Sequence, residues 1–347
     1  MTRKFLLWLA GVVGFLLLLE IFFQLLPVST STETGYYIDP LILSYPPYHH
    51  WTTSTGWDLR NVQRLESNNL GYVANRDFER NANAVALIGD SFVEASMLAA
   101  PDRPGAQLER ALGGRPVFAM GNPGTALLDY AERIRFAHTH YGVRDFVVLM
   151  ERGDVKQSLC GSGNINGPCL DPKTLEPRIE KLPPAGTLKR IFRHSALAQY
   201  VFGQLKFSPQ QLLRQAFPPA HGANAASSQP ASGAAQMPPG QTASYVDLVT
   251  HTFFERIRPY ATGRLVIVID SDRSALAKGQ LKPDPSRARF IQLARAAGAT
   301  VIDTEPLFQA HFARSRLSLD VGPYDGHFNA LGVSLVTQAA AAAFAQP

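Results

Sequence analysis

The chain has 347 residues, of which 46% are hydrophobic and 18% are charged, and its formal net charge is +5. This composition is that of a globular protein with a large apolar core, and it excludes an intrinsically disordered chain. The net charge is mild and no cluster of Lys and Arg is interleaved with aromatic residues, so the sequence does not support nucleic-acid binding.

The first predicted element is an apolar helix over residues 5–26. FLLWLAGVVGFLLLLEIFFQLL is interrupted only by Glu20 and Gln24, and its length matches the ~20 residues that cross a bilayer as a helix. Two basic residues precede it and favour a cytoplasmic N-terminus. We therefore expect residues 1–27 to be a single-pass anchor in the inner (cell) membrane, with the remaining chain on the periplasmic or extracytoplasmic side. A cleaved signal peptide is the alternative, although its apolar region is normally about 7–15 residues long.

Residues 28–79 are rich in Thr, Tyr, Pro and Trp, so we expect a stalk and lead-in segment there, followed by one domain over residues 80–347. That domain contains five short apolar runs, which are typical of strands buried on both faces of a sheet: AVALI (84–88), PVFAM (116–120), DFVVLM (145–150), RLVIVI (264–269) and ATVID (299–303). Segments with helical spacing alternate with these runs. This order predicts an α/β fold, a parallel sheet with helices on both faces.

The connection between the third and fourth strands is too long for one crossover. It contains the Gly- and Asn-rich loop from Cys160 to Cys169, and in an exported protein a disulfide is the default interpretation of such a pair; two free thiols are the alternative. We expect a helix around residues 188–205 and a disordered Ala-, Ser- and Pro-rich insertion over residues 217–243. Two cysteines are too few for a structural zinc site, and we expect no metal or cofactor.

Two motifs carry reactive side chains to predicted strand and helix ends. Ser91, in GDSF, follows the first strand, whereas Asp325 and His327, in YDGHFNALG, precede the last helix. Ligands of open parallel sheets bind at the carboxyl ends of the strands. A serine becomes nucleophilic when a base takes its proton, and an imidazole base needs a carboxylate that fixes its tautomer. The sequence therefore predicts a nucleophilic serine; an ordinary Gly-Asp-Ser turn is the alternative.

With these two motifs and the lead-in SNNLGYV, the chain resembles the SGNH/GDSL hydrolase superfamily from about Asn68 to its end. The resemblance implies a three-layer α/β/α sandwich with a five-stranded parallel, flavodoxin-like sheet. It also implies Ser91 as the nucleophile, His327 as the general base and Asp325 as the partner that orients the base.

The resemblance further implies an oxyanion hole formed by the backbone N–H groups of Ser91 and Gly124, with Gly121 as the alternative to Gly124. The family has an asparagine donor after the third strand, and here Gly153 stands at that position. Arg152 is a candidate substitute because a guanidinium only donates hydrogen bonds. An ion pair with Glu151 or Asp154 is the alternative for this arginine.

The spacing of the last motif is a second departure from the family. The family usually places its aspartate three residues before the histidine, a position that Tyr324 occupies here, whereas Asp325 lies two residues before His327. Asp320 is a more distant alternative partner, and a Ser–His dyad is another.

Together, the resemblance and the expected export imply a serine-dependent ester hydrolase or acyl transferase that acts outside the cytoplasm. Its expected substrate is an O-acetylated polysaccharide of the cell envelope or the extracellular space, and its expected partners are the membrane and envelope polysaccharide machinery. A lipase or lysophospholipase-like esterase is one alternative. A catalytically silent scaffold subunit of a polysaccharide machine is another, because the family asparagine is missing.

Overall fold

The computed structural model describes residues 2–30, 33–162, 166–205, 239–322 and 325–345. The chain forms two compact units, which are described separately below. Unit 1 comprises Met1–Glu33, His50–Glu66 and Pro183–Pro230, and unit 2 comprises Thr34–His49, Ser67–Leu182 and Ala231–Pro347. The segment that we expected to be a stalk and lead-in is therefore divided between the two units.

Unit 2 contains the predicted five-stranded parallel sheet. Its strands, in spatial order, are β11 (Thr300–Asp303), β10 (Leu265–Ile269), β7 (Asp145–Met150), β5 (Val85–Gly89) and β6 (Val117–Gly121). All four neighbouring pairs run parallel. Read from β6 and numbered along the chain, the order is 2-1-3-4-5, which is the flavodoxin-like order. The predicted fold class is confirmed.

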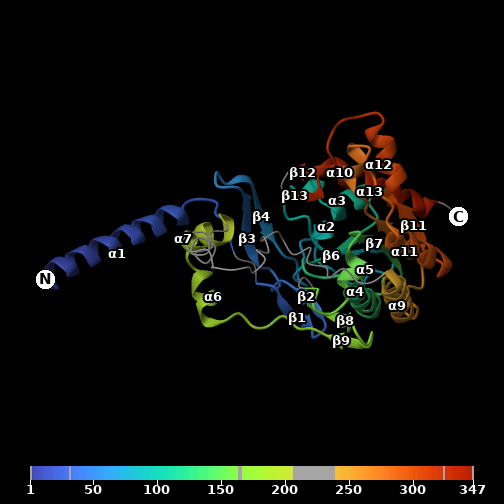
Figure 1. The fold of residues 1–347 in the computed structure, drawn as a ribbon, viewed down its shortest axis with the longest axis horizontal. Helices are drawn as coiled ribbons and strands as arrows, with labels where there is room; N and C mark the ends of the chain where they lie inside the picture. Colours follow the sequence, from blue (N-terminus) through green and yellow to red (C-terminus); the bar gives the residue numbers. More distant parts are fainter. Residues whose placement is uncertain (1, 31–32, 163–165, 206–238, 323–324, 346–347) are drawn as a thin grey trace. The chain divides into compact units, whose positions relative to one another are not determined.

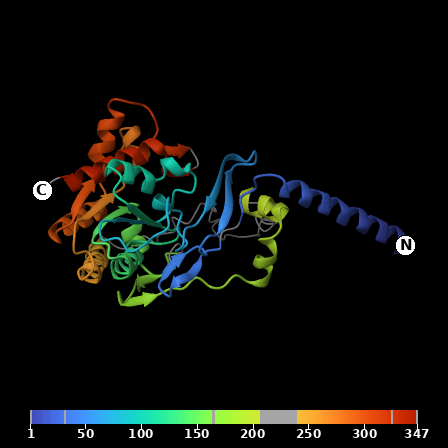
Figure 2. The same cartoon turned by 180° about the vertical axis from the view of Figure 1, so that it is seen from behind.

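Helices cover both faces of this sheet (Figures 1 and 2). One core lies between the sheet and the helices α4 (Leu127–Tyr141), α9 (Pro239–Ile257) and α11 (Pro285–Ala296). The other lies between the sheet and the helices α2 (Ser91–Glu94), α3 (Pro104–Ala111), α12 (Thr304–Phe312) and α13 (Ala330–Ala345). Side chains alternate along a strand, so β5 sends Ala86 and Ile88 into the first core and Val85 and Leu87 into the second. Two apolar layers explain why the strand sequences show no polar alternation.

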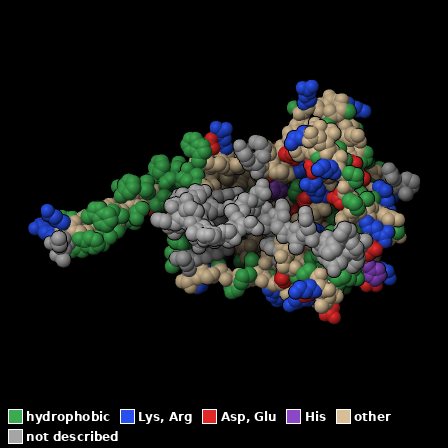
Figure 3. Space-filling view, viewed as in Figure 1, with side chains coloured by type: hydrophobic (Ala, Val, Ile, Leu, Met, Phe, Trp, Pro, Cys, Tyr) green, Lys and Arg blue, Asp and Glu red, His purple; other side chains and the backbone are tan. Residues whose placement is uncertain are grey.

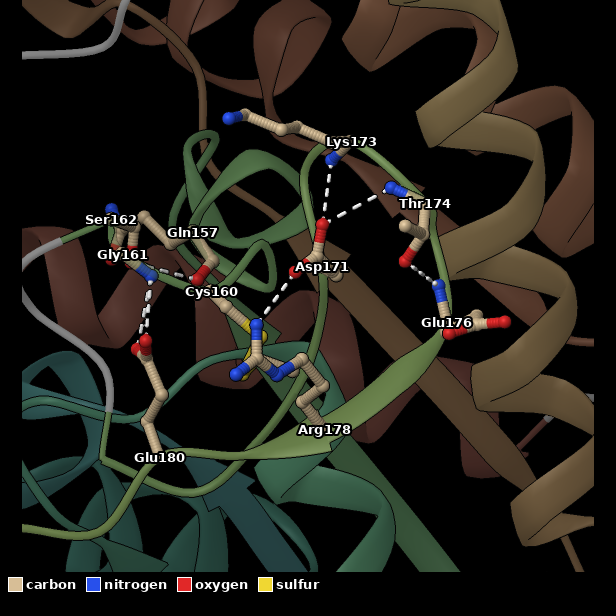
Figure 4. Close-up of a disulfide and its surroundings, with 11 residues drawn as sticks. Gln157, Cys160, Gly161, Ser162, Asp171, Lys173, Thr174, Glu176, Arg178 and Glu180 are labelled. Atoms are coloured by element: carbon tan, nitrogen blue, oxygen red, sulfur yellow. Dashed lines mark hydrogen bonds and ion pairs between the residues drawn. A yellow bond between two sulfur atoms is a disulfide. The ribbon is translucent and has the colours of Figure 1, made fainter.

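The long connection after β7 contains the predicted disulfide. Cys160 and Cys169 are bonded, with 5.1 Å between their Cα atoms (Figure 4). The N–H of Gly161 donates to the Glu180 carboxylate, and the Cys160 N–H donates to the carbonyl of Leu170 at 2.8 Å. The other elements of unit 2 are β1 (Gly35–Asp39), β2 (Ile42–Ser44), η1 (Ala100–Asp102), α5 (Asp154–Gln157), β8 (Pro168–Leu170), β9 (Pro177–Ile179), α10 (Arg273–Ala277), β12 (Asp320–Gly322) and β13 (Asp325–Phe328).

Unit 1 contains the apolar N-terminal helix. Its elements are α1 (Thr2–Gln24), the hairpin strands β3 (His50–Thr55) and β4 (Arg60–Glu66), and the helical segments α6 (Thr187–Phe192), α7 (Ala196–Ala198) and η2 (Gln199–Gln204). The span Arg3–Gln24 is long and apolar enough to cross a membrane, with a mean hydropathy of 2.5, and hydrophobic side chains cover its surface (Figure 3).

Two expectations for the irregular parts of the chain need comment. The insertion that we expected over residues 217–243 lies outside the described residues as far as position 238, and α9 begins at Pro239. Residues 28–79 contain four short strands, which we did not expect. Strands β3 and β4 are mostly half-exposed or exposed and rich in Thr, Arg and Gln, so they lack the apolar pattern that marks a buried strand.

Candidate active site

The Gly-Asp-Ser sequence forms the turn between β5 and α2. A Cβ atom on Gly89 would lie 2.6 Å from the carbonyl oxygen of Leu149, so no larger residue fits where the strand ends. The side chain of Asp90 caps α2 by accepting a hydrogen bond from the N–H of Phe92 at 2.8 Å. Ser91 is the first residue of the helix, and its side chain is presented at the carboxyl edge of the sheet.

Ser91, His327 and Asp325 are connected by hydrogen bonds. The Ser91 hydroxyl lies 2.8 Å from Nε2 of His327, and Nδ1 of the same ring lies 2.6 Å from Oδ1 of Asp325. An ionised carboxylate only accepts hydrogen bonds, so the network assigns the ring proton to Nδ1 and leaves Nε2 as the acceptor of the serine hydroxyl. The backbone N–H of His327 also donates to Asp325 at 3.0 Å, and this second hydrogen bond fixes the orientation of the carboxylate.

A buried arginine holds the strand that carries His327. The Arg273 guanidinium donates to the carboxylates of Asp270 and Asp320 and to the carbonyl of Gly326, and it lies 4.2 Å from the centroid of the Phe328 ring. Asp320, which we considered as a distant partner of the histidine, is therefore engaged by Arg273. The guanidinium connects the end of β10 to β12 and β13.

The charges around His327 favour its protonated form. Burial opposes a charge on the ring, but the hydrogen bond that the ring donates to Asp325 and the charges of the nearby carboxylates outweigh it and raise the pKa of His327 above its usual 6.5. The same hydrogen bond lowers the pKa of Asp325. Burial raises the pKa of Asp90 to about 6 and that of Glu94 to about 7, and Glu94 accepts a hydrogen bond from the Tyr45 hydroxyl at 2.7 Å. The site therefore contains several acids that titrate near neutral pH.

The two candidate oxyanion glycines occupy different environments. A Cβ atom on Gly121 would lie 2.3 Å from the backbone nitrogen of Glu94, so this glycine allows α2 to pack against the end of β6. Gly124 has a φ of +76°, a conformation that favours glycine. Within the part of the chain that the structure describes, neither the N–H of Ser91 nor that of Gly124 has a hydrogen-bond acceptor.

Arg152 is engaged in ion pairs. Its Nη1 donates to Asp272 at 2.6 Å, and its Nε lies 3.7 Å from Glu151. Among the described residues, Arg152 does not hydrogen-bond to Ser91 or His327. Asp154, the other carboxylate beside it in the sequence, instead accepts the Tyr130 hydroxyl at 2.9 Å.

Glu151 was considered from the sequence only as an ion-pair partner of Arg152, and Arg133 was not singled out. Burial raises the pKa of Glu151 to about 7, and its carboxylate accepts the N–H of Gly153 at 2.5 Å. Arg133 is buried in α4 and donates from Nη1 to the carbonyl of Gly89 at 2.6 Å and to that of Met120 at 3.1 Å, so it joins the ends of β5 and β6. The signal for Arg133 was a charged residue on the apolar face of LLDYAERIRFAH.

Unit 2 also contains a cavity and one group of potential metal ligands. The cavity, of about 440 Å³, lies at the carboxyl ends of β7, β10 and β11, and its polar lining includes Arg152, Asp272, Gln280 and Lys282. In the described ranges, one group of three potential metal ligands lies together: Cys160, Cys169 and Glu180. Both sulfur atoms are joined in the disulfide, so this group offers no pair of thiolates.

In its sheet order and in the placing of Gly-Asp-Ser and Asp-x-His at one edge of the sheet, the chain resembles the SGNH/GDSL hydrolases. No protein-family model and no curated protein matches the sequence.

Several solved structures are similar to the chain. A lipolytic protein of the G-D-S-L family from Veillonella parvula has 11% identity and a TM-score of 0.39, covering 76% of this chain and 99% of that one. A lipase/acylhydrolase from Enterococcus faecalis has 11% identity and a TM-score of 0.38, covering 76% and 95%. A variant of an acetyl-xylooligosaccharide esterase from Geobacillus has 13% identity and a TM-score of 0.37, covering 75% and 93%. These likenesses are too distant to assign an activity to this chain.

Proposed function

We propose that the chain is a serine-dependent ester hydrolase or acyl transferase of the SGNH/GDSL type. The observation that carries this proposal is the run of two hydrogen bonds from the Ser91 hydroxyl through His327 to Asp325. A nucleophile, a base with its accepting nitrogen turned to the hydroxyl and a carboxylate behind the base are the three parts that acyl transfer requires.

The reaction proceeds in two halves. As Oγ of Ser91 attacks the ester carbonyl carbon, Nε2 of His327 takes the hydroxyl proton, and Asp325 stabilises the imidazolium that forms. The tetrahedral intermediate then collapses, the alcohol leaves with the proton from Nε2, and the acyl group stays on Ser91. Water or a second hydroxyl attacks the acyl-enzyme in the same way, giving an acid or a new ester, and the proton returns to Ser91.

The N–H groups of Ser91 and Gly124 are the proposed oxyanion donors, and their lack of acceptors within the described chain supports this assignment. Losing one such donor typically costs ~2.7–4 kcal/mol of transition-state stabilisation. Arg152 is the proposed third donor in place of the family asparagine. Asp272 holds Nη1 of this arginine at 2.6 Å, so the proposed donors to the oxyanion are the remaining guanidinium N–H groups.

The proposed setting is the outer face of the cell membrane, with α1 as the anchor and the catalytic residues on the periplasmic or extracytoplasmic side. Arg3 and Lys4 at the start of α1 support this orientation. The disulfide supports it as well, because disulfides persist in oxidising compartments.

The proposed substrate is an O-acetylated envelope or extracellular polysaccharide, and envelope polysaccharide machinery is the proposed partner. The charged and amide side chains Arg152, Asp272, Gln280 and Lys282 in the cavity can hydrogen-bond to sugar hydroxyls, and one similar solved structure is named for acetyl-xylooligosaccharides. A silent scaffold is the second candidate, and Gly153 at the position of the family asparagine favours it.

The test uses the full chain in detergent with an O-acetylated oligosaccharide, and it follows both acetate release and acetyl transfer to an unacetylated oligosaccharide. Ser91→Ala is the control. We expect a reaction that the substitution removes; transfer faster than release identifies a transferase. A preference for long-chain lipid esters moves the assignment to a lipase. The absence of any serine-dependent reaction, together with no labelling of Ser91 by a fluorophosphonate, contradicts the proposal and favours the scaffold.

A further inference from the structure

The end of α1 is tied to the helical segment α7–η2 within unit 1. The Glu20 carboxylate accepts hydrogen bonds from Oγ of Ser195 at 2.7 Å and from the next two backbone N–H groups at 2.8 and 3.1 Å. Three residues further along α1, the Phe23 ring stacks on Tyr200 with 4.5 Å between centroids. The single acid in the apolar helix therefore has a structural partner, since it satisfies the first N–H groups of α7.

The turn of the β3–β4 hairpin is fixed to the same segment. The Tyr200 hydroxyl donates to the carbonyl of Trp57 at 2.7 Å. Nε2 of Gln204 donates to the carbonyl of Gly56 at 2.7 Å and to Oγ of Ser54 at 3.0 Å. The end of α1, the segment α7–η2 and the hairpin turn are thus held together by specific contacts.

Large hydrophobic side chains are exposed on these elements and on α6. We call them the apolar collar: Trp57 (74% exposed), Ile191 (60%), Phe192 (42%), Phe202 (47%) and Leu205 (43%). The rings of Phe192 and Phe202 contact each other at 5.8 Å between centroids, which joins α6 to η2. Single exposed apolar residues are normal, but a group of them on connected elements marks an interaction surface.

The length of α1 places this surface relative to a bilayer. The 22 residues of Arg3–Gln24 span about 33 Å as a helix, close to the ~30 Å thickness of the hydrocarbon core. Glu20 lies four residues, or about 6 Å, before the end of that span. If α1 crosses the membrane, as proposed above, the segment bonded to Glu20 lies at the outer border of the hydrocarbon core.

We propose that the apolar collar inserts into the outer interface of the bilayer that α1 crosses, as a second membrane contact of unit 1. Tryptophan favours this zone, and interfacial segments bury their apolar face about 5–10 Å into it. Arg190 is exposed beside Ile191 and adds a positive charge that suits anionic headgroups. The segment α7–η2, which carries part of the collar, is bonded to the end of α1 through Glu20 and Phe23, and this link to the proposed anchor favours lipid over a second protein as the partner.

The test is photo-crosslinking of the full chain in nanodiscs of phosphatidylethanolamine and phosphatidylglycerol that contain radiolabelled lipid. The photoreactive amino acid p-benzoylphenylalanine replaces Trp57 or Phe202 in separate variants. Leu17, 59% exposed on α1, is the positive control, and Leu317, 66% exposed in unit 2, is the negative control. Each variant is used only as a monodisperse species.

We expect about tenfold more lipid adduct at positions 57 and 202 than at position 317, because side chains buried in the bilayer interface contact lipid and side chains in water do not. Lipid adducts at position 17 but not at 57 or 202 contradict the insertion of the apolar collar and still agree with α1 as a membrane anchor. If positions 57 and 202 crosslink to protein instead of lipid, the collar binds a partner chain, and its proposed insertion into the bilayer is contradicted. If position 17 gives no lipid adduct, the proposed membrane anchor is contradicted, and so is the insertion of the collar, which depends on it. These results do not bear on the proposed chemistry at Ser91.

Discussion

The hydroxyl of Ser91 and Nε2 of His327 lie 2.8 Å apart, although the two residues are 236 positions apart in the chain. Strand β5 of the parallel sheet delivers the serine to its carboxyl edge, and β13, in the separate antiparallel pair β12–β13, carries the histidine just before α13. Arg273 donates a hydrogen bond to β13, and Arg133 donates to the ends of β5 and β6, so we expect both arginines to support this contact. The proposed chemistry can be tested by substituting the residues at and around this contact.

The first prediction concerns the pH profile. His327 must be neutral to act as a base, and its pKa is raised, so kcat/KM should fall on acidification with a midpoint above pH 6.5. The charge of Glu94 contributes to that shift. Glu94→Gln should therefore move the midpoint to lower pH, as followed by aryl acetate hydrolysis. Asp247→Asn, at a half-buried position on α9 that pairs with Arg289, should leave the profile unchanged. A midpoint below 6.5 in the wild type contradicts this account.

The second prediction concerns Arg273 as a positioning residue. Its guanidinium makes hydrogen bonds to Asp270, Asp320 and the carbonyl of Gly326, and an ammonium cannot reproduce that fork. Arg273→Lys should lower kcat by about 100-fold, the typical cost of a displacement near 1 Å, with a smaller effect on KM. Unchanged kcat in a folded Arg273→Lys variant shows that the arginine does not position His327.

The third prediction concerns stability against pH. Burial raises the pKa of Asp129 from 3.8 to about 7. Between these values the folded state keeps a proton that the unfolded state releases, so the stability that Asp129 contributes is greatest at low pH, falls as pH rises above 3.8 and is lost by about pH 7. The slope reaches about 1.4 kcal/mol per pH unit for one such group.

Denaturant unfolding at pH 5 to 8 measures this slope. Asp129→Asn should reduce it, because the amide does not titrate. Asp247→Asn is the matched control, since Asp247 pairs with Arg289, which lowers the pKa of the aspartate. A slope that Asp129→Asn leaves intact means that other groups cause it.

The fourth prediction concerns the disulfide. The bond closes a loop between positions nine residues apart. Replacing Cys160 and Cys169 together by alanine should lower the free energy of unfolding by about 2–3 kcal/mol, from the loop-closure entropy of the unfolded chain. Wild-type protein with reductant should match the double variant. An unfolding curve that neither treatment changes contradicts a stabilising role.

Much of unit 2 could be predicted from the sequence because its signals are local. A run such as Val85–Gly89 is buried on both faces, so its composition alone identifies a strand. The helix after each of the first two strands follows from spacing in the same way. One short motif follows β5 and the other precedes α13. Ligands of open parallel sheets bind at the carboxyl edge, so we expected the two motifs to lie together there.

The remaining features depend on contacts between distant positions. Arg152 and Asp272 are 120 residues apart, and nothing in either segment indicates that they pair. The same holds for Glu20 and Ser195, 175 residues apart, in unit 1. The four strands between residues 28 and 79 are short and, in β3 and β4, polar, so their pairing rather than their composition makes them strands.

The most direct measurement is hydrolysis of an aryl acetate by the wild-type chain and by Ser91→Ala, with an aryl octanoate alongside. The account predicts acetate turnover that falls to background in the variant, with octanoate the poorer substrate. Turnover that survives the loss of the Ser91 hydroxyl contradicts it, as does an inactive wild-type chain whose serine no fluorophosphonate labels.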